Sequence, residues 1–126
     1  MKTLNRTKKQ KYQETTIYKA VSNMHMNYVG YFRSFDNSIK NSIGISIDRL
    51  IVSLMDNMRS SYFEDDKEAK RRHSEIAVEL FDKIEWRFSM LKHEYKCLSD
   101  KQYAILCSHC ASIESNLNRW NEKLHS

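Results

Sequence analysis

The sequence predicts an all-α fold, specifically an antiparallel up-down-up-down bundle of four helices. Its 126 residues include no proline and only two glycines, so the residues that usually mark hairpins and strand ends are missing. Apolar residues recur in steps of three and four, the period of one helix face. The breaks between these segments are short and polar, which places consecutive helices antiparallel.

The first two helices are predicted from two apolar stripes in the first half of the chain. The first stripe comprises Ile17, Val21, Met24, Tyr28, Tyr31 and Phe35. The second comprises Ile43, Ile47, Leu50, Leu54 and Met58, widened by Ile51 and Met55. The polar segment 33–41 is expected to connect them. Stripes of this period belong to helices that pack side by side at a shallow angle.

The last two helices follow the same pattern. The third stripe comprises Ala77, Phe81, Ile84, Phe88, Leu91 and Tyr95, and the fourth comprises Tyr103, Leu106, Cys110, Ile113, Leu117, Trp120 and Leu124. Acidic residues in segment 64–67 suit the start of the third helix, where the helix dipole favours negative charge. Ser99 followed by Gln102 fits a capping box at the start of the fourth.

The charge of +5 is concentrated at the N-terminus. Residues 1–11 hold Lys2, Arg6, Lys8, Lys9 and Lys11 and no acid, whereas the rest of the chain has equal numbers of basic and acidic residues. We therefore divide the chain into a basic arm, 1–11, and a four-helix bundle domain, 12–126. The arm is interpreted either as a solubilising or disordered terminus or as a segment that binds phosphates.

The composition also indicates the cellular compartment in which we expect the protein. No run of apolar residues approaches the 18 or so that a membrane span needs, and no signal peptide is recognisable. Three cysteines are an odd number and do not form a secreted disulfide framework. We expect a cytoplasmic protein with reduced thiols and no membrane partner.

No arrangement of residues predicts catalysis, so we expect that the protein is not an enzyme and has no cofactor. Cys107, His109 and Cys110 raise the alternative of a structural zinc site, with His93 and Cys97 as further ligands. However, Cys110 lies on the fourth stripe and Cys107 is close beside it, so both are interpreted as small core residues. A Glu-x-x-His pair, typical of di-iron bundles, is absent.

Nucleic-acid binding is the better supported function. The third helix carries Arg71, Arg72, Lys83 and Arg87, and the last two are four residues apart, on one side of the helix. Regularly spaced cations on a rigid helix follow nucleic acid phosphates. The alternative is an ordinary charged face, in which Glu79 and Asp82 pair with these cations.

The chain also carries more apolar side chains than the four stripes need. These residues lie partly off the stripes: Val52, Met55, Tyr62, Phe63, Ile76, Leu80 and Trp86. Because a lone small bundle leaves some of them in water, we expect the subunits to associate.

Three segments resemble a known family. They are FDNSIKNSIGISIDRLI (35–51), KIEWRFSMLKHEYKCLSDKQY (83–103) and IESNLNRW (113–120). Their order and spacing resemble the accessory variability determinant (Avd) proteins of diversity-generating retroelements, and relatives encoded in intervening sequences of bacterial 23S rRNA genes. The positions that match the family pattern are Lys83, Arg87, Leu98, Ser99, Gln102, Tyr103, Leu117 and Trp120.

The resemblance implies a non-enzymatic four-helix bundle that assembles into a ring-like homopentamer. Such a protein binds the retroelement reverse transcriptase and its template RNA and supports error-prone cDNA synthesis in mutagenic retrohoming. Lys83 and Arg87 match basic positions of the family and are the first candidates for RNA or polymerase contact. Arg71, Arg72 and the arm residues Lys8, Lys9 and Lys11 complete the predicted surface. The alternative is the intervening-sequence type of bundle, with a structural or unknown role and no polymerase partner.

Overall fold

The computed structural model describes residues 2–125, and of residues 2–6 it describes the backbone alone, so the predicted arm side chains Lys2 and Arg6 lie outside the described side chains. The described residues contain no β-strand, and the prediction of an all-α fold is confirmed. The helices are α1 (Lys2–Gln13), α2 (Thr16–Phe32), α3 (Asn37–Ile39), a π-helical turn η1 (Lys40–Gly44), α4 (Ile45–Phe63), α5 (Lys67–His93) and α6 (Asp100–His125).

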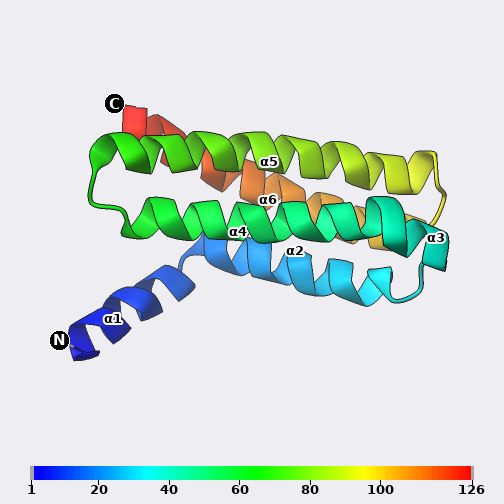
Figure 1. Ribbon diagram of the computed structural model, residues 1–126, viewed down its shortest axis with the longest axis horizontal. Helices are drawn as coiled ribbons and strands as arrows, with labels where there is room; N and C mark the ends of the chain where they lie inside the picture. The colour runs from blue at the N-terminus through cyan, green and yellow to red at the C-terminus, as the bar shows by residue number, and fades with distance from the viewer. Residues whose placement is uncertain (1, 126) are drawn as a thin grey trace.

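Four long helices, α2, α4, α5 and α6, lie side by side, and α1 is angled away from them (Figure 1). The most extensive packing is between α4 and α5, followed by α5 with α6 and α2 with α6. Between residues 2 and 125, no helix combines the length and the apolar character that crossing a bilayer requires.

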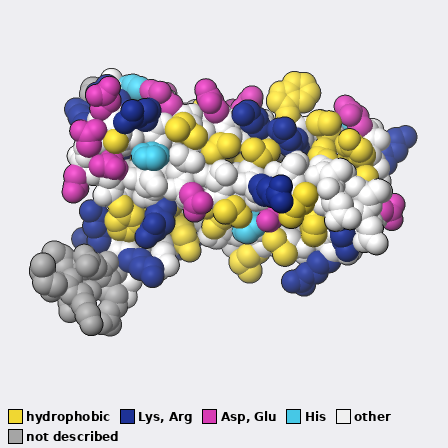
Figure 2. Space-filling model, viewed as in Figure 1, with side chains coloured by type: hydrophobic (Ala, Val, Ile, Leu, Met, Phe, Trp, Pro, Cys, Tyr) yellow, Lys and Arg dark blue, Asp and Glu magenta, His cyan; other side chains and the backbone are white. Residues whose placement is uncertain are grey.

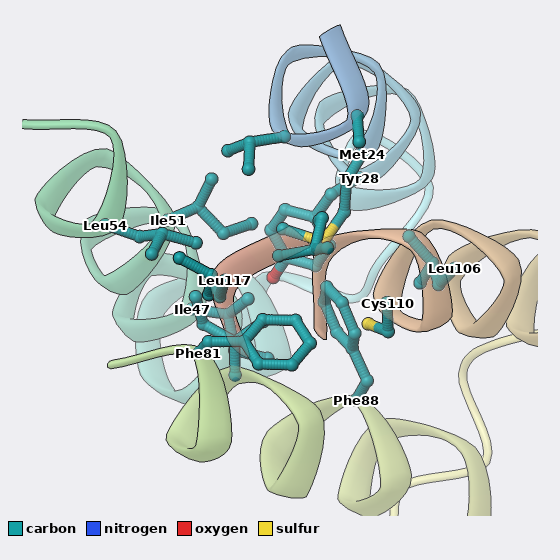
Figure 3. Packing of buried hydrophobic residues seen from close by; sticks show 14 of the residues in the cluster. Met24, Tyr28, Ile47, Ile51, Leu54, Phe81, Phe88, Leu106, Cys110 and Leu117 are labelled. Carbon is teal, nitrogen blue, oxygen red and sulfur yellow. The ribbon is translucent and has the colours of Figure 1, made fainter. Parts of the chain in front are cut away.

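One hydrophobic core lies between these four helices, and Figure 3 shows side chains from all of them pointing into it. The fully buried side chains include Tyr28, Phe88, Met24, Ile47, Ile51, Leu54, Ile84, Leu106, Ile113 and Leu117. The core is therefore made of the stripes that the sequence predicts. Truncating one such side chain to alanine in a packed core costs about 2 to 5 kcal/mol.

The starts of α2, α5 and α6 are closed by side chains. The Thr15 Oγ1 accepts a hydrogen bond from the Tyr18 N–H (3.2 Å) at the start of α2, and the Asp66 carboxylate accepts one from the Ala69 N–H (2.9 Å) at the start of α5. The predicted capping box is present at α6. The Gln102 N–H donates to Ser99 Oγ (3.1 Å), and the Ser99 N–H donates to Gln102 Oε1 (3.0 Å).

The predicted connection at 33–41 is too long, because the chain is helical again from Asn37. The π turn Lys40–Gly44 inserts an extra residue before α4. Within α4 the buried stripe runs through Ile47, Ile51 and Leu54, whereas Leu50 is only partly covered. Gly44 allows the close packing here, since a Cβ at this position lies 2.8 Å from the Ile39 carbonyl oxygen and 2.9 Å from Phe32 Cε2.

Two predicted core positions are wrong. Tyr95 is 44% exposed because α5 ends at His93, and the chain then turns through the left-handed backbone of Lys96 (φ 53°). Cys107 is also exposed. Three residues along a helix rotate a side chain to within about 60° of the starting direction, and that offset is enough to bring Cys107 out while Cys110 stays buried.

Candidate nucleic-acid interface

The structure separates the predicted basic residues into three places. Lys83 and Arg87 lie in the second half of α5, Arg71 and Arg72 lie near its start, and Lys8, Lys9 and Lys11 lie on α1. Each place has different neighbours, and these neighbours decide how much of the positive charge is available to a polyanion.

On α5, Lys83 is exposed and Arg87 is half-buried, whereas Ile84 and Phe88 point into the core. The Arg87 Nη1 donates a long hydrogen bond (3.4 Å) to the Lys83 carbonyl oxygen. Among the described residues, no carboxylate oxygen lies within 4.0 Å of either cation. The alternative of a charged face, in which Glu79 and Asp82 pair with these cations, is therefore not observed among the described residues.

Trp86 lies between these two cations, three residues after Lys83 and directly before Arg87, and 68% of its side chain is exposed. Figure 2 shows Lys, Arg and hydrophobic side chains interspersed along this part of α5. An exposed indole beside two cations offers a ring face for a base and positive charge for the adjacent phosphates. We name Lys83, Trp86 and Arg87 the α5 surface.

Arg71 and Arg72 have acidic neighbours. They line a hollow of about 220 Å³ together with Glu68, Glu75 and His125. The imidazole Nε2 of His125 lies 3.1 Å from Glu75 Oε1, and Figure 2 shows acidic side chains gathered where α5 begins. Arg72 is exposed, but these carboxylates lower the positive potential around it.

The adjacent Lys70 has a structural role. Its Nζ donates hydrogen bonds to the carbonyl oxygens of Ser61 (2.6 Å) and Tyr62 (3.0 Å), and the Ser61 Oγ donates to the Lys70 carbonyl oxygen (2.9 Å). Burial, and next the nearby charge of Lys8, lower the pKa of Lys70. This lysine therefore satisfies the last carbonyls of α4 and ties them to α5.

Helix α1 contains both the basic arm and Tyr12, whose side chain is buried. The Tyr12 ring lies 5.2 Å from that of Tyr18, 4.7 Å from that of Tyr62 and 5.6 Å from that of Phe63, measured between centroids. Burial raises the pKa of Tyr12 to about 12, so its phenol stays neutral at physiological pH. This aromatic cluster attaches α1 to the ends of α2 and α4.

A hollow of about 530 Å³ lies beside this cluster, between α1, α2 and α4. It is lined by Lys8, Lys9, Tyr12, Gln13, Tyr18, Arg59 and Phe63. The Lys8 Nζ lies 5.4 Å from the Phe63 ring centroid, and the Arg59 guanidinium carbon lies 5.7 Å from it, so both cations pack over the same ring. We name this feature the α1 hollow.

The structure therefore brings Lys8 and Lys9 to a common site but leaves Lys11, which is exposed, outside it. The sequence interpretation missed Arg59, Tyr18 and Phe63 as members of this site. Arg59 and Phe63 are four residues apart at the end of α4, and this spacing of a cation and a ring on one face is the signal that the sequence offers.

The cysteines do not converge with other ligands. The Cys110 thiol is buried, and burial raises its pKa to about 12. The histidines pair between helices instead: His25 Nε2 lies 2.8 Å from Asp48 Oδ1, and His109 Nε2 lies 2.7 Å from Asn27 Oδ1. In the part of the chain that the structure describes, no three His, Cys, Asp or Glu side chains are grouped as a metal ion needs.

No protein-family model matches this chain, and no curated protein or solved structure is similar enough to count as a match.

Proposed function

We propose that this protein is a non-enzymatic, RNA-binding accessory subunit of a diversity-generating retroelement. In this role it binds the reverse transcriptase and the template RNA and supports error-prone cDNA synthesis in mutagenic retrohoming. The proposal is supported above all by the α5 surface, where Lys83 and Arg87 have no carboxylate within 4.0 Å among the described residues. It rests also on the resemblance of segments 35–51, 83–103 and 113–120 to the Avd proteins.

The α5 surface supplies the two interactions that single-stranded RNA binding uses. Cations that neutralise phosphates release condensed counterions, and this release makes the affinity fall as salt rises. An exposed aromatic ring stacks bases irrespective of sequence, because every base has a π face. Trp86 and its two neighbouring cations provide both on one side of a rigid helix.

The proposed working unit is an antiparallel up-down-up-down bundle that assembles as a ring-like homopentamer in the cytoplasm. Exposed apolar side chains favour association, since Val52 on α4 and Ile76 on α5 are each 40% exposed. A ring repeats the α5 surface once per subunit, so several weak contacts act on one RNA chain.

RNA affinity measured against salt tests the charge component. For single-stranded RNA the logarithm of the affinity should fall with the logarithm of salt, with a slope of about 0.7 per phosphate neutralised. The double variant Lys83→Ala/Arg87→Ala removes two such contacts. The slope should fall by about 1.4, and the affinity at 0.1 M salt should drop roughly ten- to thirtyfold.

A matched control is Lys19→Ala/Arg49→Ala, which removes two exposed cations from α2 and α4. Both doubles should keep the wild-type helical circular dichroism. Equal loss of affinity in the two doubles contradicts the assignment to the α5 surface and reduces it to a general charge effect.

Co-purification tests the polymerase component. A tagged copy of this protein, expressed with a retroelement reverse transcriptase encoded beside its gene, should retain that enzyme at low salt. If the tagged protein retains RNA but not the enzyme, the result favours the alternative, an intervening-sequence type of bundle without a polymerase partner.

A further inference from the structure

We propose that the α1 hollow binds one nucleotide of a single-stranded RNA, with its phosphate held by Lys8, Lys9 and Arg59 and its base against the rings of Tyr18 and Phe63. This proposal rests on the proposed function and extends it, because it adds a second contact point at the end of the helices where α1 joins. The α5 surface and the α1 hollow share no residue.

The charge of the hollow favours a phosphate. The described residues that line it include three cations and no carboxylate. The positive excess is also felt nearby, since the charge of Lys8 contributes to the lowered pKa of Lys70. Among the described residues, no carboxylate oxygen lies within 4.0 Å of Lys8, Lys9 or Arg59. Like charges held together by the fold gain most when an anion enters between them.

The walls of the hollow favour an aromatic base. Tyr18 and Phe63 are half-buried, so each ring is held by packing and still presents surface to solvent. The side-chain amide of Gln13, which also lines the hollow, can donate and accept hydrogen bonds at a base edge. A volume of about 530 Å³ lies within the range of roughly 300 to 1,000 Å³ that is typical of small-ligand sites.

A structural explanation competes with this proposal. Lys8 of α1 packs over Phe63 of α4 and so helps to hold α1 in place, while Arg59 packs over the same ring from within α4. Lys9 separates the two explanations, because it lines the hollow but has no such contact with the ring, and Lys11 lies outside the hollow on the same helix. Lys9→Ala and Lys11→Ala remove the same charge from exposed positions two residues apart.

The experiment measures binding of a fluorescein-labelled 12-nucleotide oligouridine at 0.1 M salt. Lys9→Ala should weaken binding three- to fivefold, because one phosphate contact at this salt is worth a factor of about 5, and Lys11→Ala should weaken it less than twofold. Equal effects of the two variants overturn the proposal, because they reduce the arm to a diffuse positive charge.

Arg59 gives an independent readout. Arg59→Ala should weaken oligouridine binding at least fivefold, Arg59→Lys should recover part of that loss, and Arg49→Ala, on the same helix and outside the hollow, should leave binding within twofold. Equal loss in Arg59→Ala and Arg59→Lys, with normal circular dichroism, contradicts a phosphate contact.

Two further probes identify the source of the nucleotide. Uridine monophosphate should compete with the oligouridine only at concentrations at least a hundredfold higher than unlabelled oligouridine, and inorganic phosphate should compete less than either. Competition by the mononucleotide at the same concentration as the oligonucleotide overturns RNA as the ligand and assigns the hollow to a free nucleotide.

The α5 double variant distinguishes failure of this proposal from failure of the proposed function. Suppose that Lys83→Ala/Arg87→Ala loses binding and that Lys9→Ala and Lys11→Ala do not differ. This result rejects only the proposal for the α1 hollow and leaves the proposed function in place. Loss in Lys9→Ala and Arg59→Ala, with an unaffected α5 double variant, supports the hollow and rejects the α5 surface.

Discussion

The two basic pairs of α5 are alike in composition and differ in their neighbours. Arg71 and Arg72 near its start share a hollow with Glu68 and Glu75, whereas the cations of the α5 surface have no carboxylate within 4.0 Å among the described residues. A count of basic residues along the helix treats the two regions as equal. Their surroundings leave more positive potential at the second region than at the first.

The two regions also differ in how far their basic side chains are buried. The Arg71 Nε is buried and has no hydrogen-bond partner in the structure, and the neighbouring Lys70 is used to close the end of α4. Arg72 is the one member of the run 70–72 that is exposed, since Lys70 and Arg71 are half-buried. At the other region, Lys83 is exposed and Trp86 projects beside it. Adjacent cations in a sequence therefore indicate a binding surface only where the fold leaves them outward and unopposed.

The largest expected effect within this comparison belongs to Trp86. Trp86→Ala should lower oligouridine affinity at least about fivefold, because base stacking on an aromatic side chain is worth about 1 to 3 kcal/mol per base. The slope of affinity against salt should stay unchanged, because no charge is lost. Fluorescence anisotropy at several salt concentrations measures both quantities.

The matched control for Trp86 is Met26→Ala, which truncates an apolar side chain that is 71% exposed on α2. It should leave RNA affinity within twofold. If Trp86→Ala instead leaves RNA binding intact but dissociates the oligomer in sedimentation experiments, the indole is a subunit contact and the α5 surface loses its stacking component.

A smaller effect is expected from removing the acids beside Arg71 and Arg72. Glu68→Gln/Glu75→Gln should raise RNA affinity about two- to threefold at low salt. The reason is that the two carboxylates lower the positive electrostatic potential around Arg71 and Arg72, and the variant removes both negative charges. Adding Arg71→Ala/Arg72→Ala to this variant should cancel the gain. An unchanged affinity shows that acidic neighbours are not the reason for the difference between the two regions.

The smallest effect concerns Glu85, the acid that lies between Lys83 and Trp86 in sequence. Burial, and next the charges of Glu114 and Asp82, raise its pKa. A carboxyl whose pKa is raised on folding stabilises the fold while it is protonated, and this contribution is lost as the pH rises from about 4 through the folded-state value. Glu85 therefore opposes folding at pH 7.

Glu85→Gln should accordingly raise the thermal midpoint at pH 7, by the equivalent of about 0.2 to 0.5 kcal/mol for the loss of a like-charge neighbour. The gain should vanish near pH 3, where the wild-type carboxyl is also neutral. RNA affinity should not change, because Glu85 lines a hollow with Phe88, Tyr103, Cys107 and Cys110 instead of facing the cations. A marked rise in RNA affinity contradicts this placement.

Much of the fold was predictable, because helix periodicity is a local property. Residues such as Val21, Ile84 and Ile113 are predicted as core and are buried. The errors occur where the period is interrupted. The π turn at Lys40–Gly44 lies within the predicted connection 33–41, and the early end of α5 left Tyr95 in solvent.

The candidate site was predictable only in part. The spacing of Lys83 and Arg87 is visible in sequence, and so is the charge of the arm. The α1 hollow was not predictable, because it joins Lys9 to Arg59, and such a long-range approach depends on the packing of Tyr12 against the ends of α2 and α4.

By itself the sequence determined the helical class, most residues of the core and the supply of positive charge, because each follows from the types and spacing of neighbouring residues. The tertiary structure decided which cations act as surface charges. Packing buried part of Arg71, used Lys70 to satisfy the end of α4, and placed Lys8, Lys9 and Arg59 around one hollow. A cation's availability depends on the groups within a few ångströms of it, and most of those groups come from other helices.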